Sequence, residues 1–477
     1  MRIPEAMQPM LRVWSNRNYA YFMGGMTPSL ITLWMQRIGT LWLAWELTKS
    51  NAWVGLIVAA DYAPMMVLAP FVGAFTDRSD PIVLQKITQW LNLLLSAVMA
   101  AMTFVGLMNI WLLLVLSLML GCLHPFNAIS RHAIVPNTVP KAEIPTALAT
   151  DSALYNAARF IGPALAGIVI ELWGVGYTMA ANSIGCAFYL AGLQAMRLEL
   201  PERKGHGHAG MLADIAEGLA YVRGHAGIGP LFLLMTVGAI WVRPLQDLLP
   251  GFAAQVFQSG PSGLGWLTAG MGVGATIAAA LVAMYGRTTG LTVMVLLAFL
   301  VNLAATLCFV ASGYLWVAVL VGAVWGGSLT MMSTGTQALV QSSVDNSIRA
   351  RVMSLYTMIY RGAPFIGAIV IGWAADRIGL QLAFAIALLL CVGPWLMTVR
   401  RRSTMTLALE GRGNDLDDRL LAASRNWAGL RYEQLVDLRL RAAPIAQHLR
   451  DRSKRLATRA RHIRLGDRLQ SLLQRRH

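Results

Sequence analysis

Charged residues are scarce in this chain of 477 residues. Only 13% are Asp, Glu, Lys or Arg, whereas 56% are hydrophobic, and the mean hydropathy is +0.55. A soluble globule of this composition would leave far too much apolar surface in contact with water. The composition therefore excludes soluble folds and indicates an integral membrane protein.

The chain is also poor in residues and motifs that carry chemistry. Its four cysteines, Cys122, Cys186, Cys308 and Cys391, all fall in apolar stretches and lack the spacing of metal ligands. The sequence contains no phosphate-binding loop and no credible nucleophile constellation. We therefore expect no disulfide, no metal, no cofactor and no enzymatic activity.

Long apolar stretches fill the chain as far as residue 397. A run of about 20 apolar residues spans the ~30 Å hydrocarbon core of a bilayer, and only helices that satisfy their own hydrogen bonds repeat such a crossing. We therefore predict an all-α membrane protein with twelve transmembrane helices. The predicted helices occupy residues 19–47, 52–75, 84–107, 110–130, 144–173, 175–196, 229–257, 262–285, 290–312, 314–340, 352–374 and 380–399.

The twelve stretches divide into two sets of six, separated by a Gly-, His- and charge-rich loop. The fifth helix reads LYNAARFIGPALAGIVI and the eleventh LYTMIYRGAPFIGAIVI, an echo typical of two duplicated, pseudo-symmetric halves. The first residues have no apolar core or cleavage site of a signal peptide, so we expect a cytoplasmic lead-in. The predicted parts are the lead-in 1–18, the first half 19–196, the linker 197–228, the second half 229–399 and the tail 400–477.

Lysine and arginine are distributed unevenly between the loops. With the N-terminus inside, fourteen of them flank the cytoplasmic ends of the helices before the tail, whereas only Lys49 and Arg377 lie outside. Cations near helix ends are retained on the cytoplasmic side. We expect a multi-pass protein of the plasma membrane, which is the inner membrane in a bacterium, with both termini cytoplasmic.

The tail carries most of the net charge, +11 of the total of +16. Between Tyr432 and Leu449 its apolar residues are spaced for one helical face with arginines around them, which favours a basic helix lying on anionic lipid headgroups. A solvated tail without a specific role is the alternative. Nucleic acid is not expected as a partner, because the tail lacks interleaved aromatic residues.

Two motifs resemble those of the major facilitator superfamily. The end of the second helix, Gly73-Ala-Phe-Thr-Asp77-Arg78-Ser-Asp80, resembles the signature G-x-x-x-D-R-x-G-R-R/K, from which Asp80 and the following proline depart. The fifth helix, with Gly162, Pro163 and Gly167, resembles an element of the superfamily's antiporters. This resemblance implies two six-helix halves that rock, with conformational gating residues Gly73, Asp77, Arg78, Gly162, Pro163 and Gly167.

Further segments refine the resemblance. Residues 131–143 and 346–356 look like the enterobactin-exporter-like and macrolide-efflux branch. A second GxxxDR, Gly372 to Arg377, ends the eleventh helix on the outside, and we interpret it as a helix terminus rather than a second gate. The fourth helix lacks the central arginine of drug/proton antiporters. Its polar residues are His124 and, at its inner end, Arg131. We interpret His124 as a polar residue whose hydrogen bonds are made within the protein rather than as a proton relay.

Six ionisable residues lie deep within the predicted helices. Each costs about 2.5 to 3.5 kcal/mol on membrane insertion scales, so function or a partner retains it. These candidate substrate and coupling residues are Arg37, Asp61, Arg159, Arg243, Asp247 and Arg361.

Their positions predict pairing, a hinge and a coupling mechanism. Arg37 and Asp61 lie at similar depth on neighbouring helices and could pair, while the prolines around Arg243 and Asp247 can break the seventh helix. The excess of buried cations predicts an anionic substrate near the midplane; structural ion pairs are the alternative. The expected proton carrier is Asp61, and Asp247 is the second candidate.

These inferences converge on a secondary transporter. We expect a proton-coupled exporter of an amphipathic, anionic small molecule such as a siderophore or an antibiotic, driven by the proton gradient and acting as a monomer in the lipid bilayer. The alternatives are an importer or a lipid or lysophospholipid flippase of the same fold, and a non-transporting scaffold that acts through its tail.

Overall fold

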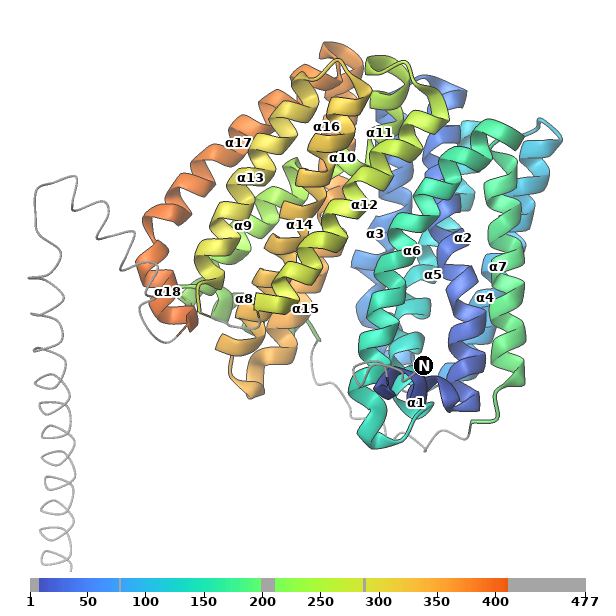
Figure 1. Ribbon diagram of the computed structural model, residues 1–477, viewed down its shortest axis with the longest axis horizontal. Helices are drawn as coiled ribbons and strands as arrows, with labels where there is room; N and C mark the ends of the chain where they lie inside the picture. Colours follow the sequence, from blue (N-terminus) through green and yellow to red (C-terminus); the bar gives the residue numbers. More distant parts are fainter. Residues whose placement is uncertain (1–7, 77–78, 199–210, 286–288, 411–477) are drawn as a thin grey trace, which may run out of the picture. The chain divides into compact units, whose positions relative to one another are not determined.

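The computed structural model describes residues 8–76, 79–198, 211–285 and 289–410, and every regular element in these ranges is helical (Figure 1). The residues Met1–Arg412 cluster as one compact unit. Most of the predicted tail, including the expected lipid-binding helix at 432–449, lies outside the described residues.

The first half contains six long helices in the predicted places. They form because apolar side chains dominate them and each segment must satisfy its own backbone hydrogen bonds in lipid. Local caps start two of them: Asp80 accepts a bond of 2.8 Å from the Ile82 N–H, and Asn109 one of 2.9 Å from the Leu112 N–H. The helices are α2 (Arg17–Thr48), α3 (Asn51–Thr76), α4 (Pro81–Phe104), α5 (Ile110–Ile134), α6 (Ile144–Trp173) and α7 (Gly176–Ala195).

The second half repeats this plan, but its seventh and eleventh helices are each interrupted, first at a proline. Pro244 begins a new short helix after α9, and Pro364 separates α15 from α16, because proline lacks the N–H that would continue the ladder. The predicted break of the seventh helix is thereby confirmed. The elements are α9 (Ile228–Trp241), α10 (Pro244–Asp247), α11 (Leu249–Gly251), the π-helical turn η4 (Phe252–Val256), α12 (Gly260–Tyr285), α13 (Leu291–Ala311), α14 (Leu315–Ser343), α15 (Asn346–Gly362), α16 (Pro364–Ile378) and α17 (Leu380–Arg400).

Short elements gather at one end of the bundle, which we call the α1 end (Figure 1). The amphipathic α8 packs on α15, and the Glu410 carboxylate at the end of α18 accepts bonds of 2.6 and 2.8 Å from the N–H groups of Gly290 and Thr292 at the start of α13. The opposite end, where α2 meets α3 and α16 meets α17, is the far end. The short elements are α1 (Gln8–Ser15), η2 (Val135–Asn137), η3 (Lys141–Glu143), α8 (Met211–Gly224) and α18 (Arg402–Glu410).

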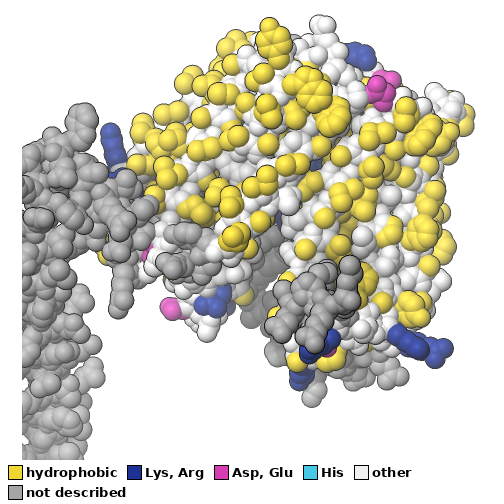
Figure 2. Space-filling view, in the orientation of Figure 1, with side chains coloured by type: hydrophobic (Ala, Val, Ile, Leu, Met, Phe, Trp, Pro, Cys, Tyr) yellow, Lys and Arg dark blue, Asp and Glu magenta, His cyan; other side chains and the backbone are white. Residues whose placement is uncertain are grey.

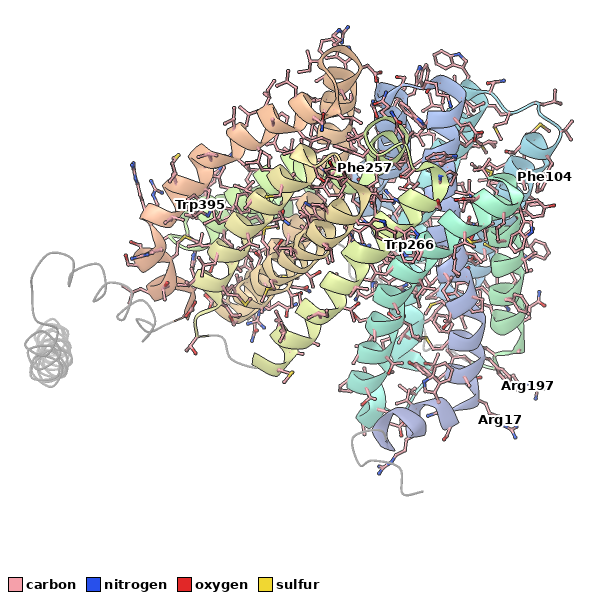
Figure 3. The ribbon with its side chains drawn as sticks, turned by 45° about the horizontal axis from the view of Figure 1, so that its top comes forward. Arg17, Phe104, Arg197, Phe257, Trp266 and Trp395 are labelled. Carbon is pink, nitrogen blue, oxygen red and sulfur yellow. The ribbon has the colours of Figure 1, made fainter. Side chains whose placement is uncertain are left out.

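The first half is tied together at the α1 end. The Asn18 side chain exchanges two hydrogen bonds of 3.0 and 3.1 Å with the backbone of Arg197, so the beginning of α2 lies beside the end of the half. Figure 3 shows Arg17 and Arg197 next to each other there.

Ten helical segments of the described residues are long and apolar enough to cross a membrane. The helices α2 and α7 occupy the other two predicted positions but fall short in hydropathy, because they carry polar side chains such as Gln36 and Asn182 into the protein interior. Figure 2 shows the visible face covered mainly by hydrophobic side chains, the surface expected to contact lipid.

Two helix pairs make the main contacts between the halves: α3 packs against α16, and α6 packs against α12. Small residues permit the close approach, as is usual in membrane bundles. A Cβ atom on Gly167 of α6 would lie 2.6 Å from the Cα of Gly265 in α12, and one on Gly372 of α16 would lie 2.4 Å from the carbonyl oxygen of Asn51 in α3. Larger residues at these crossings would therefore push the halves apart.

Candidate functional site

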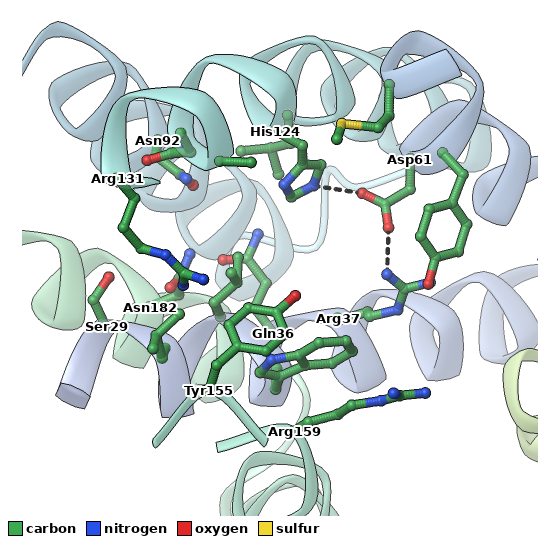
Figure 4. A pocket seen from close by; sticks show the side chains of 18 of the residues that line it. Ser29, Gln36, Arg37, Asp61, Asn92, His124, Arg131, Tyr155, Arg159 and Asn182 are labelled. Carbon is green, nitrogen blue, oxygen red and sulfur yellow. Dashed lines mark hydrogen bonds and ion pairs between the residues drawn. The ribbon is translucent and has the colours of Figure 1, made fainter. Parts of the chain in front are cut away.

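A cavity of about 230 Å³ lies at the junction of the two halves. The six helices of the first half supply most of its wall, and the second half contributes Arg243, Tyr360 and Arg361. Its lining extends from Asp61 to Arg131 in the last turn of α5, so the cavity reaches toward the α1 end. Figure 4 shows the central part of this wall.

Arg37 of α2 connects carboxylates from both halves. Its Nη1 lies 2.9 Å from Asp61 Oδ2 on α3, and its Nη2 lies 3.2 Å from Asp247 Oδ1 on α10. His124 of α5 places Nε2 2.7 Å from the other oxygen of Asp61 (Figure 4). The expected pairing of Arg37 with Asp61 is confirmed, and the partner of His124 is a carboxylate that lines the cavity.

Arg243 and Asp247 have different partners although they are four residues apart. Asp247 reaches Arg37, whereas the Arg243 guanidinium donates to the backbone carbonyl of Tyr360 and lies 4.2 Å from the centre of that ring. Both contacts position α10 after the helix break at Pro244. Arg243 therefore helps to hold the broken helix against α15.

Arg159 and Arg361 have no carboxylate within 4.0 Å among the residues described. Arg159 donates from Nη2 to Gln246 Oε1 at 3.1 Å, and Arg361 is exposed to the cavity. Arg131, by contrast, has a carboxylate partner, because its guanidinium lies 3.6 Å from the buried Asp151 carboxylate. Three cavity cations thus have no described carboxylate within 4.0 Å: Arg243, which donates to the Tyr360 carbonyl, and Arg159 and Arg361, one from each half.

The far end is closed by a contact between the halves that we call the Asp376 clasp, formed by Asp376 of α16 with Ser50, Asn51 and Ala52. The carboxylate accepts from the N–H groups of Asn51 at 2.7 Å and Ala52 at 3.1 Å, from the Asn51 amide at 3.3 Å, and from the Ser50 hydroxyl. It therefore caps the N-terminus of α3 from the other half.

The expected gating residues have different surroundings. Gly73 lies within α3, but Asp77 and Arg78 lie outside the described residues. In α6, a Cβ on Gly162 would lie 2.5 Å from the Ile31 carbonyl oxygen of the same half, so this glycine serves packing of α6 on α2, with Pro163 following inside the helix. Among the α6 glycines of this motif, Gly167 makes the approach to the second half.

Sequence reasoning did not anticipate two features of the site. Asp376 lies in the last turn of α16, as expected of a helix terminus, but its contact with the start of α3 in the other half was not anticipated. The resemblance of its motif to the signature at Gly73 was the available signal. The aromatic side chains Trp34 and Tyr155 line the cavity, with ring centres 6.0 Å apart, and no sequence pattern marked them.

The comparison with known proteins decides the family. A family model described as "Transmembrane secretion effector" matches residues 22–425. The chain belongs to this family of the major facilitator superfamily. It is therefore a membrane transporter of the secondary, efflux-related kind.

The relatives of this chain include efflux proteins and a staphyloferrin A transporter. Macrolide efflux protein A of Streptococcus pyogenes is 22% identical over 388 residues, covering 80% of this chain and 95% of the relative. The staphyloferrin A transporter of Staphylococcus aureus is 22% identical over 371 residues, covering 74% and 88%. Multidrug efflux pump Tap of Mycolicibacterium fortuitum is 24% identical over 364 residues, covering 72% and 85%.

Solved structures agree on the fold. A mutant of the nucleoside transporter NupG superposes with a TM-score of 0.62 at 14% identity, covering 81% of this chain and 99% of that one. The human organic anion transporter MFSD10 superposes with a TM-score of 0.56 at 16% identity, covering 83% and 100%. The predicted superfamily fold is confirmed.

Proposed function

We propose that this protein exports an amphipathic, anionic small molecule in exchange for protons, with the α1 end facing the cytoplasm. The observation that carries the proposal is the bridge made by Arg37 between Asp61 of its own half and Asp247 of the other. An ion-pair network that joins two mobile bodies inside a cavity links proton binding to their movement.

The coupling follows from which half each partner belongs to. Opening the far end separates the halves, and Arg37 and Asp247 then part because they lie on different bodies. Asp247 thereby loses its cation and can accept a proton from the far side, while Asp61 keeps Arg37 and His124 in its own half. When the halves close again Arg37 recovers Asp247 and the proton leaves toward the α1 end.

The substrate is expected to be an anion because of Arg159 and Arg361. A guanidinium group without a carboxylate partner attracts an acidic ligand, and both groups line the same cavity. The names of the curated relatives, a macrolide efflux protein and a staphyloferrin A transporter, support an exporter of amphipathic molecules.

Three places in the molecule are expected to control the opening and closing of the two ends. The Asp376 clasp closes the far end, the Gly167–Gly265 crossing supports the closed arrangement, and the signature residues Gly73, Asp77 and Arg78 are expected to act at the α1 end. The basic tail is expected to contact anionic headgroups at that same end.

Inverted membrane vesicles with an imposed acid-inside proton gradient test the function. The unaltered chain is expected to accumulate at least one member of a panel of siderophores, macrolides and lysolipids, and Asp61→Asn to reduce gradient-driven accumulation at least about tenfold while still reaching the membrane. Asp80→Asn is the matched control, since Asn caps a helix as well as Asp and position 80 lies outside the cavity.

Each other outcome has a defined meaning. Undiminished accumulation by Asp61→Asn would remove Asp61 from the coupling mechanism. Accumulation of lysolipid alone would favour the flippase alternative, and no gradient-dependent transport of any compound would favour the scaffold.

A further inference from the structure

Two aromatic rings stand at the centre of the cavity, each beside two guanidinium groups. The Trp34 ring lies 5.6 Å from Arg37 Cζ and 5.7 Å from Arg159 Cζ. Trp34 is half-buried, lines the cavity and meets the ring of Tyr155 edge-on. Figure 4 shows Tyr155 between Arg131 and Arg159.

The second ring repeats the pattern. The Tyr155 ring lies 4.8 Å from Arg131 Cζ and 5.9 Å from Arg361 Cζ. Arg131 is compensated by Asp151, whereas Arg361 has no carboxylate within 4.0 Å among the described residues. At each ring, therefore, one guanidinium is paired with a carboxylate and the other is not.

The two uncompensated groups come from opposite halves. Arg159 lies one helical turn beyond Tyr155 on α6, and Arg361 ends α15. Aromatic faces attract cations, and a planar guanidinium stacks on a ring while its N–H groups bind a carboxylate. The same four side chains thus offer π-surface and positive charge together.

We propose that the cavity selects an aromatic acid: the acidic group pairs with Arg159 and Arg361, and the ring packs against Trp34 and Tyr155. This inference rests on the proposed function, because it takes the cavity as the substrate site, and it adds the chemical class. A saturated acid gains the charge contacts alone. A neutral aromatic compound gains the ring contacts alone.

Three probes of similar shape separate these contributions. They are 1-naphthoate, decahydronaphthalene-1-carboxylate and 1-naphthalenemethanol, titrated calorimetrically into the full-length chain in lipid nanodiscs. One favourable aromatic and one cation–π contact together are worth about a factor of ten in affinity. We expect 1-naphthoate to bind about tenfold more tightly than the saturated acid. We also expect it to bind more tightly than the alcohol, which lacks the charge contacts with Arg159 and Arg361.

Variants assign the preference to residues. Tyr155→Leu is expected to reduce the advantage of 1-naphthoate over the saturated acid from about tenfold to about threefold, because Trp34 remains, while Tyr155→Phe, which keeps the ring, retains it. Arg361→Gln is expected to reduce the advantage of 1-naphthoate over the neutral alcohol, because only Arg159 then pairs with the acidic group. Trp111→Leu, an exposed tryptophan that pairs with Trp53 away from the cavity, is expected to retain both.

Equal binding of the aromatic and saturated acids, equal binding of 1-naphthoate and the alcohol, or no saturable binding of 1-naphthoate would each overturn the proposal. Gradient-driven accumulation by the same protein in inverted vesicles reports separately on the exporter function. A chain that transports but shows no preference for 1-naphthoate disproves only the aromatic-acid site.

Discussion

Removing the carboxylate of Asp376 should shift the balance between the two arrangements of the halves. The clasp exists only while the far end is closed, because Asp376 belongs to α16 and its partners Asn51 and Ala52 to α3. Loss of a helix N-cap costs about 0.5 to 2 kcal/mol. Since Asp376 also accepts from Ser50 and from the Asn51 amide, we expect Asp376→Ala to cost the closed state about 1 to 2 kcal/mol, which raises the open population about 5- to 30-fold.

The shift is measurable as a distance distribution. Spin labels at Leu107 and Tyr314, two exposed far-end positions on different halves, report opening by pulsed electron resonance in a chain whose four cysteines are replaced by alanine. Asp376→Ala is expected to enlarge the long-distance component. The matched control is Arg377→Gln, since Arg377 stacks on Trp373 within its own helix.

Two results would refute the reasoning. An unchanged distance distribution in Asp376→Ala would show that the clasp does not control the far end. An equal shift in Arg377→Gln would show that any change of charge on this surface has the same effect.

Four further predictions concern stability and coupling. Arg37→Met leaves Asp61 and Asp247 without their cation and should destabilise the protein by about 3 to 5 kcal/mol, seen as a lower Tm that adding Asp61→Asn partly restores. Gly167→Val would force its Cβ into Gly265, so we expect lost transport in vesicles that contain normal amounts of protein. Glu410→Ala removes the acceptor for two N–H groups of α13 and should lower Tm, whereas Glu410→Gln should lower it less.

The fourth prediction concerns pH: burial lowers the pKa of His225, whose Nδ1 accepts from two N–H groups at the start of α9. A depressed folded-state pKa means that this contribution is complete above about pH 6.5 and is lost as the pH falls. The Tm difference between the unaltered chain and His225→Ala should therefore shrink from pH 8 to pH 5.

Much of the fold could be predicted because its cause is local. Each crossing is a run of apolar residues, and a bilayer leaves such a run only one regular structure, so most predicted helices appear within a few residues of their observed bounds. The eleventh is the exception, since it begins at Asn346 and is divided at Pro364. The break at Pro244 was equally predictable, since it follows from the missing N–H of proline. The similar depth of Arg37 and Asp61 in the membrane, on neighbouring helices, was enough to predict that they lie side by side.

Contacts between distant helices were not predictable in this way. Arg243 and Asp247 are four residues apart, a spacing that puts two residues on one face of a continuous helix, but the helix break sends Asp247 to Arg37 and Arg243 to Tyr360. The position of Asp376 at a helix terminus was predictable, but nothing local shows that α3 begins against it.

The sequence by itself therefore determined the membrane class, the helices and the identity of the costly buried charges. The reason is that each segment must by itself be apolar enough to enter the bilayer. Only the tertiary structure decided which charges neutralise one another and which, Arg159 and Arg361, are without a described carboxylate beside Trp34 and Tyr155. Pairing depends on helix rotation and crossing, which are fixed by side-chain packing between segments far apart in the chain.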